Sequence, residues 1–258
     1  MRPLGVIGPL SRDVVAGAPP RIGGGPWHAA RALRILRRDA IIFAKCGEPR
    51  LRTQLAALGL PATFAPADET TAFSFSYDDS GARTMAVDAV GPSFRSDDVP
   101  DEFLRRVDWL QVAPLLRGDF DPDTLERLAR GRHLLFDGQG LVRARKTGPL
   151  VLDDSFDPEL LRHVTVLKLA VEEAAAIGDV EALGVPEVLI TFGLEGSRVV
   201  TRDGAVDVPA RPLANDPTGA GDAFAAGYVA ARADGHRPVS AARRATALVA
   251  ALLMGEAR

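Results

Sequence analysis

The chain is poor in cysteine and lysine. Its 258 residues include one cysteine, Cys46, and the positive charge is nearly all arginine, with lysine only at positions 45, 146 and 168. One cysteine rules out an internal disulfide framework, and a lone thiol fits the reducing conditions of the cytosol. A Walker A phosphate loop carries a lysine after a GxxxxG run, and no lysine of this chain stands there. Disulfide-rich secreted scaffolds and P-loop nucleotide binders are therefore excluded.

Long apolar runs and a strong charge of either sign are also missing. No stretch approaches the roughly 18 apolar residues that a membrane helix needs. The start of the sequence, MRPLG, leads into an apolar segment that is too brief for a secretion signal. The net charge of −3 gives no reason to expect a nucleic acid or an anionic membrane as partner. With 47% hydrophobic and 25% charged residues, the composition predicts one cytoplasmic domain over residues 1–258.

Segments with strand and helix patterns alternate along the chain. The expected strands are 4–7, 40–44, 71–77, 83–87, 109–113, 133–137, 164–169, 187–191, 198–201 and 205–208, and the expected helices are 27–36, 51–58, 124–129, 172–177, 220–233 and 239–254. The turn signals DDSG and RDG predict two hairpins. This order predicts an α/β fold with a doubly wound, mostly parallel sheet, helices on both faces and antiparallel strands at the edge. The first hairpin, over 71–87, is a candidate lid.

The run NDPTGAGDAF, residues 215–224, is the most informative part of the sequence. A helix that begins in a glycine-rich turn presents unpaired N–H groups and the positive end of its dipole, which suits phosphate. Asp222 adds a carboxylate in the first helical turn. An anion site beside a proton acceptor is what phosphoryl transfer to a hydroxyl requires. Since capping alone also favours aspartate in a first turn, the prediction depends on the whole run.

This run resembles the C-terminal signature of the ribokinase-like (PfkB) carbohydrate kinase family. The resemblance implies that Asp222 is the catalytic base, next to the substrate hydroxyl. It also implies an anion hole for the transferred phosphate, made by Gly219, Ala220 and Gly221. Asp216 and Thr218 match positions that shape the turn. Asp216 is expected to ligate a monovalent cation, as in some members, and Thr218 and Gly221 are expected to contact the nucleotide.

The N-terminal part of the chain resembles the substrate-binding positions of the family. Asp13 follows the first strand, where relatives carry an aspartate that hydrogen-bonds substrate hydroxyls; a carboxylate suits this role because it accepts two hydroxyl hydrogens. The run GGGPWH resembles the GG-x-x-x-N signature, so Gly23 and Gly24 are expected against the substrate. His28 stands where Asn is usual and is expected to act as a substrate-contacting donor. A surface carboxylate at Asp13 and a packed ring at His28 are the alternatives.

Two further runs resemble the nucleotide-binding positions. The run TFGLEGS resembles the T-x-G-x-x-G turn that holds the nucleotide phosphates and ribose, which implies contacts from Thr191, Gly193 and Gly196. A plain strand–turn–strand is the alternative. Thr246 stands where many relatives have an asparagine on the adenine side.

The run AVEE, residues 170–173, resembles the N-x-x-E motif. Glu173 keeps the acid, which in relatives helps to hold Mg²⁺ through water. Ala170 replaces the asparagine, so that nucleotide contact is missing. A pair of acids favoured by the helix dipole is the alternative for Glu172 and Glu173.

These resemblances imply an ATP-dependent kinase with Mg²⁺ and a monovalent cation, acting on a small polyol or sugar as monomer or homodimer. Ala170, the runs AKCG and LFDGQGLVR, and reduced lid elements at about 9–24 and 70–88 look most like myo-inositol kinases. A sugar or nucleoside kinase of the same family is the alternative. The departures at His28, Ala170 and Thr246 keep open a non-catalytic nucleotide- or sugar-binding protein on this scaffold. A nicotinamide-dependent oxidoreductase is disfavoured because no G-x-G-x-x-G follows the first strand.

Overall fold

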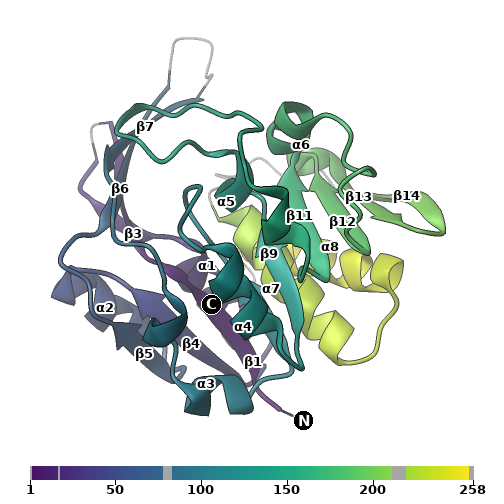
Figure 1. The fold of residues 1–258 in the computed structure, drawn as a ribbon, viewed down its shortest axis with the longest axis horizontal. Coiled ribbons are helices and arrows are strands. Elements are labelled where there is room, and N and C mark those ends of the chain that lie inside the picture. Colours follow the sequence, from purple (N-terminus) through teal and green to yellow (C-terminus); the bar gives the residue numbers. More distant parts are fainter. Residues whose placement is uncertain (1, 17, 78–82, 211–218, 256–258) are drawn as a thin grey trace.

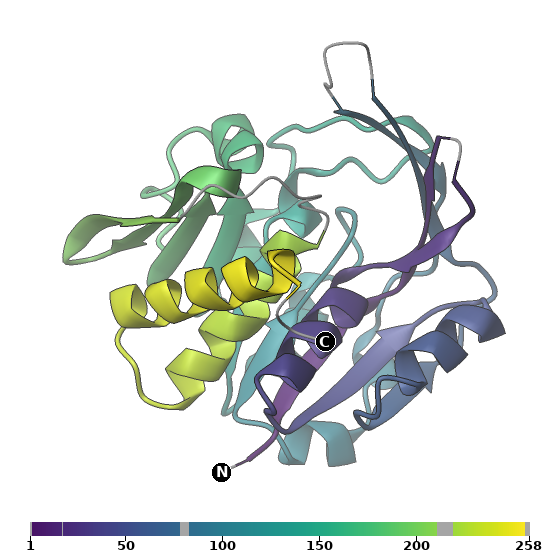
Figure 2. The same ribbon diagram turned by 180° about the vertical axis from the view of Figure 1, so that it is seen from behind.

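Two β-sheets of unequal size form the frame of the protein (Figure 1). The computed structural model describes residues 2–16, 18–77, 83–210 and 219–255. The larger sheet and the helices on its faces make up most of the molecule, and the smaller sheet extends from one end of it (Figures 1 and 2). Among the described residues, we find no helix with the length and apolar character needed to cross a membrane.

The larger sheet has nine strands in the order β14-β13-β12-β11-β9-β8-β1-β4-β5. They are β1 (Leu4–Pro9), β4 (Ala40–Lys45), β5 (Ala62–Ala65), β8 (Trp109–Val112), β9 (His133–Asp137), β11 (Val166–Ala170), β12 (Glu187–Thr191), β13 (Gly196–Thr201) and β14 (Gly204–Pro209). Each pair from β5 to β12 is parallel, and β13 and β14 are antiparallel additions. Parallel strands are buried on both faces, which explains the apolar run AIIFA of β4. The predicted mostly parallel sheet is confirmed.

Helices cover both faces of this sheet. They are α1 (Gly25–Ile35), α2 (Pro49–Ala56), α3 (Asp101–Arg105), α4 (Pro122–Ala129), α5 (Gln139–Val142), α6 (Val171–Ile177), α7 (Ala220–Ala233) and α8 (Pro238–Leu253), with short 3₁₀ turns at Ser96–Asp98, Pro158–Leu161 and Gly193–Glu195. The α1, α2, α7 and α8 helices pack into one apolar core with Val6, and α3, α4 and α6 pack into a second with Ile7. Val6 and Ile7 are consecutive residues of β1, and they enter opposite cores because successive side chains of a strand point to opposite faces of the sheet.

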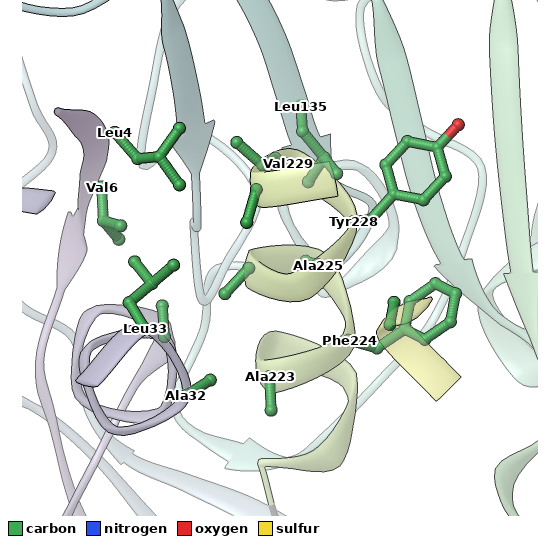
Figure 3. Packing of buried hydrophobic residues seen from close by; sticks show 14 of the residues in the cluster. Leu4, Val6, Ala32, Leu33, Leu135, Ala223, Phe224, Ala225, Tyr228 and Val229 are labelled. Carbon is green, nitrogen blue, oxygen red and sulfur yellow. The ribbon is translucent and has the colours of Figure 1, made fainter. Parts of the chain in front are cut away.

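Helix α7 lies in the first core and is fixed along its length. Figure 3 shows its Ala223 near Ala32 of α1. Small residues allow a close approach on the α8 side as well, since a Cβ atom at Gly227 would lie 2.9 Å from Leu248 Cδ2. The fixed helix axis determines where the N-terminal turn of α7 lies.

The smaller sheet has five strands in the order β10-β7-β6-β2-β3. They are β2 (Ser11–Val15), β3 (Arg21–Gly23), β6 (Thr71–Tyr77), β7 (Arg83–Ala89) and β10 (Gly148–Pro149). Strand β2 follows β1 after one residue, Leu10, and Figure 2 shows this purple segment passing from the larger sheet into the smaller one. Phe73, Phe75 and Val87 pack with Leu115 and Leu116 beneath this sheet. Both segments expected to form lid elements supply strands to it.

Every helix and strand expected from the sequence is present, with ends that differ by a few residues. The sequence patterns did not indicate β2, β3, β5, β10, α3 or α5. These elements have two to five residues and mixed polarity, such as Arg21–Gly23, so their pattern is too short to show a period of 2 or 3.6. The four short strands are defined by pairing with neighbouring strands, not by local sequence.

Candidate active site

A cavity of about 470 Å³ lies where the carboxyl ends of the large-sheet strands meet the N-terminus of α7 and the smaller sheet. We call it the central cavity. In an open parallel sheet this is the edge at which ligands bind. It brings together most of the residues predicted from the sequence. The predicted residues that line it are Asp13, Gly24, His28, Glu173, Thr191, Gly193, Gly196, Gly219, Ala220, Gly221, Asp222 and Thr246.

The turn that starts α7, residues 219–222, forms one wall of the central cavity. We call it the anion turn. Gly219 is the N-cap residue with φ 81°, in the left-handed region, and a Cβ atom there would lie 2.0 Å from His28 Nδ1. Both observations require glycine. The first N–H groups of α7 have no partner inside the helix, so they and the helix dipole favour an anion at this wall.

The Asp222 carboxylate lies in the first turn of α7 and faces the central cavity. Its Oδ1 atom is buried without a hydrogen-bond partner among the described residues, and a Cβ atom at Gly25 would lie 2.9 Å from it. Burial, and then the charge of Asp137, raise the pKa of Asp222 to about 7, against lowering by Lys168 and Arg143. A carboxylate with such a pKa at a cavity wall is suited to accept a proton near neutral pH.

Asp13, on strand β2, also lines the cavity. It is buried, and its Oδ1 atom accepts a hydrogen bond of 2.7 Å from Ser11 Oγ. Gly23 is not a lining residue; it makes room for Asp13, because a Cβ atom there would lie 2.1 Å from Asp13 Oδ2. Gly24, with φ 92°, starts α1, and this helix places His28 against the anion turn.

Residues expected at the nucleotide lie at the other end of the cavity. Thr191 ends β12, and its hydroxyl donates to Leu169 O at 3.2 Å. Gly196 has φ 116°, and a Cβ atom there would lie 2.2 Å from Val208 O. The Thr246 hydroxyl donates to Ala242 O at 3.0 Å. Thr218 lies outside the described residues.

Glu173, the predicted magnesium residue, is buried at the start of α6. Its Oε2 atom accepts from Ala170 N at 2.8 Å, and its Oε1 atom lies 3.5 Å from the Arg143 guanidinium. The described part of the chain holds no cluster of three or more His, Cys, Asp or Glu side chains that could bind a metal ion. Asp216, the predicted monovalent-cation ligand, lies outside the described residues.

Several lining residues were not among the candidates from the sequence. Lys168 lines the floor, Ser11 lies beside Asp13, and Phe73 and Phe75 form an apolar wall from the smaller sheet. The sequence could have indicated the lysine, because this charged residue interrupts the apolar strand VLKLA. The two phenylalanines alternate with serine in AFSFSY. This pattern indicates that both rings lie on one face of the strand, but it does not indicate which part of the protein that face covers.

Comparison with known proteins adds independent information. Residues 21–256 match the pfkB family carbohydrate kinases. Inositol 3-kinase of Zea mays is 34% identical over 168 residues, 63% of this chain and 42% of that protein. Inositol 3-kinase of Oryza sativa subsp. japonica is 34% identical over 193 residues, 67% of this chain and 47% of that protein. The matched segments thus span less than half the length of both relatives.

A solved structure supports the same fold. It is described as a pyrophosphate-dependent kinase in the ribokinase family complexed with a pyrophosphate analog and myo-inositol. It superimposes with a TM-score of 0.83 at 21% identity, covering 97% of this chain and 95% of that chain. The ribokinase-like fold predicted from the sequence is confirmed. Since the family match extends over nearly the whole chain, this protein belongs to the pfkB family of carbohydrate kinases.

Proposed function

We propose that this chain transfers a phosphoryl group from ATP to a hydroxyl of myo-inositol. The observation that carries the proposal is the Asp222 carboxylate, which belongs to the anion turn and lines the same cavity as Asp13; its Oδ1 atom is buried without a hydrogen-bond partner among the described residues. Family membership supports a kinase. The acceptor is supported by the inositol 3-kinase relatives and by the similar kinase structure that is described as a complex with myo-inositol.

The cavity residues divide between the two substrates. Asp13 and His28 orient the acceptor, since a carboxylate accepts hydroxyl hydrogens and an imidazole donates. Asp222 takes the proton of the attacking hydroxyl, and the amides of the anion turn hold the transferring phosphoryl group. In a loose transition state, positioning and charge neutralisation supply most of the acceleration.

The carboxylates around the floor fit a donor-bound Mg²⁺. Asp137 Oδ2 accepts no hydrogen bond in the described part of the chain, although the Lys168 ammonium lies 3.2 Å from it. Both Glu173 oxygens are approached by protein donors. We therefore infer that Glu173 reaches the ion through water and that Asp137 is a second contact. Magnesium is commonly held by one or two carboxylates together with substrate phosphates. When bound, it supplies charge neutralisation of those phosphates.

Pyrophosphate is the second candidate donor. Ala170 lacks the amide that the resemblance assigns to nucleotide binding, and the Thr246 hydroxyl is already engaged with Ala242. The similar structure is described as pyrophosphate-dependent. These observations favour recognition of the donor through its phosphates more than through its base.

A donor and acceptor panel tests the function. Purified protein with Mg²⁺ is given ATP or pyrophosphate and, in turn, inositols, pentoses, hexoses and nucleosides, and the products are followed by ³¹P NMR. We expect the highest kcat/KM with myo-inositol. Turnover of only a sugar or only a nucleoside would show that this compound, and not myo-inositol, is the acceptor. Binding of ligands without turnover would favour the non-catalytic alternative.

The remaining expectations stay predictions. We propose a single kinase domain over 1–258 whose smaller sheet acts as the lid, a cytoplasmic location, and a monomer or homodimer. A monovalent cation bound by Asp216 also stays a prediction.

The activity is expected to depend on pH through Asp222. Because burial and Asp137 raise the pKa of this carboxyl to about 7, only about a tenth of it is ionised one pH unit below that value. We expect kcat/KM for myo-inositol to rise with pH and to level off above about 7. Initial rates from about pH 5.5 to 8.5 measure this. A flat profile would remove Asp222 from the role of base.

A further inference from the structure

A lysine–aspartate pair is buried at the floor of the central cavity. Lys168 lies on the central strand β11 and Asp137 at the end of β9, with 3.2 Å between Lys168 Nζ and Asp137 Oδ2. Both side chains are almost fully buried, while Leu167 and Leu169 on either side of the lysine pack into the second core. Buried ion pairs add little net stability compared with apolar residues of similar size. Stability alone therefore gives no reason for a lysine in this apolar strand.

The ammonium group lies against the anion turn. A Cβ atom at Gly221 would be 2.9 Å from Lys168 Nζ, and both residues line the central cavity. A cation next to a helix N-terminus is unfavourable, because both carry positive charge. An anion bound between the ammonium and the amides of the turn reverses this repulsion. The arrangement therefore favours a phosphate at this point.

A second cation of the cavity has an unsatisfied donor. Arg143 lines the cavity, and its guanidinium lies 3.5 Å from Glu173 Oε1. Its Nε atom is buried without a hydrogen-bond partner among the described residues. Buried unpaired donors are rare in folded proteins and often mark the place of a ligand or water. The floor thus offers two positive groups to an anionic ligand.

We propose that Lys168 is a catalytic residue that contacts the transferring phosphoryl group from beneath Gly221, and that Asp137 positions its ammonium. This proposal rests on the proposed kinase function. As the bond from the acceptor oxygen to phosphorus forms, the bond from phosphorus to the donor's leaving oxygen breaks, and the acceptor proton passes to Asp222. Lys168 keeps its proton and supplies positive charge.

The surroundings keep the lysine charged. Burial, the largest single influence, lowers the pKa of Lys168, but Asp137, Glu173 and Asp222 together outweigh it, and the pKa is raised above its ordinary value. Arg143 is a second cation beside these carboxylates, because its guanidinium lies 3.5 Å from Glu173 Oε1. The ammonium form is therefore present throughout the pH range in which Asp222 titrates.

The test compares two buried lysines of the same protein. Lys45, on β4, is also buried and paired with an aspartate, Asp98, at 2.7 Å, but it does not line the central cavity. We expect Lys168→Met to lower kcat about 30- to 100-fold and to weaken binding of inorganic pyrophosphate at least tenfold in calorimetry. The KM for myo-inositol should stay within threefold. Lys45→Met should leave kcat and pyrophosphate binding within twofold.

Thermal melting shows whether each variant is folded at the assay temperature. If Lys168→Met is unfolded at that temperature, the Lys168→Arg variant is used for the test instead. Arginine keeps the charge but moves the donor atoms, so pyrophosphate binding should persist while kcat falls about tenfold. Unchanged kcat and pyrophosphate binding in a folded Lys168 variant would overturn the proposal. If the unaltered protein phosphorylates no acceptor yet binds pyrophosphate in a Lys168-dependent way, the proposed function fails and the phosphate contact stands.

Discussion

Replacing Asp222 by asparagine is expected to lower kcat for myo-inositol phosphorylation about a thousandfold, within the range for losing a general base. The side chains have the same shape, but the amide does not accept the hydroxyl proton. The amides of the anion turn remain, so donor affinity should change less than threefold. Steady-state kinetics and calorimetric titration with a non-hydrolysable ATP analogue measure the two effects. Turnover near that of the unaltered protein would show that another group accepts the proton.

Stability measurements separate chemistry from folding in this variant. The pKa of Asp222 is raised to about 7 in the folded protein from an ordinary value of 3.8. Because the pKa is raised in the folded protein, the contribution of this carboxyl to the free energy of unfolding is fully present below the ordinary pKa and is lost as the pH rises through about 7. Asp222→Asn removes that loss, so its melting temperature should exceed that of the unaltered protein at about pH 8. An inactive variant that melts lower would indicate misfolding instead.

A matched aspartate serves as control. Asp123 also lies in the first turn of a helix, α4, but is exposed and does not line the cavity. Asp123→Asn should leave kcat within twofold. Equal losses in both variants would point to a general effect of changing helix charge.

Replacing Gly219 by alanine is expected to lower kcat/KM for the donor by at least about a hundredfold, as loss of an anion-hole donor does. The backbone at Gly219 has φ 81°, and the added Cβ atom would lie 2.0 Å from His28 Nδ1. A left-handed conformation costs a residue with a Cβ atom about 1–2 kcal/mol. The ring contact adds to this, so the turn must shift and its amides lose their alignment. Donor titration and initial rates measure the result.

Gly184 provides the control for backbone strain. It has a similar φ of 69°, but a Cβ atom there would meet nothing within 4 Å. Gly184→Ala should cost comparable stability, seen as a lower melting temperature, and leave donor kinetics unchanged. If Gly219→Ala retains normal donor binding, the anion turn is not the phosphate site.

Some of the site could be predicted because its residues are close together in sequence. Gly219, Ala220, Gly221 and Asp222 form one turn, and the local pattern of glycine, aspartate and a following apolar helix is sufficient to indicate both the helix start and the anion site. The buried strands were equally clear, since burial on both faces produces continuous apolar runs.

Other parts could not be predicted because they depend on distant contacts. Whether Lys168 is a surface or a buried cation depends on Asp137, 31 residues earlier in the chain, and on Gly221, 53 residues later. The interaction between His28 and Gly219 joins the first and seventh helices. No local period or spacing relates these residues.

The amino-acid sequence by itself determined the family, the order of strands and helices, and the turn that begins α7. Tertiary structure decided which charges meet: Asp13 and Asp222 at one cavity, and Lys168 beneath the anion turn. The physical reason is that secondary structure follows from short-range periodicity and backbone preferences. The pKa of Asp222 and the burial of Lys168 arise from desolvation and from charges on separate strands, which only the packed fold brings within a few ångströms.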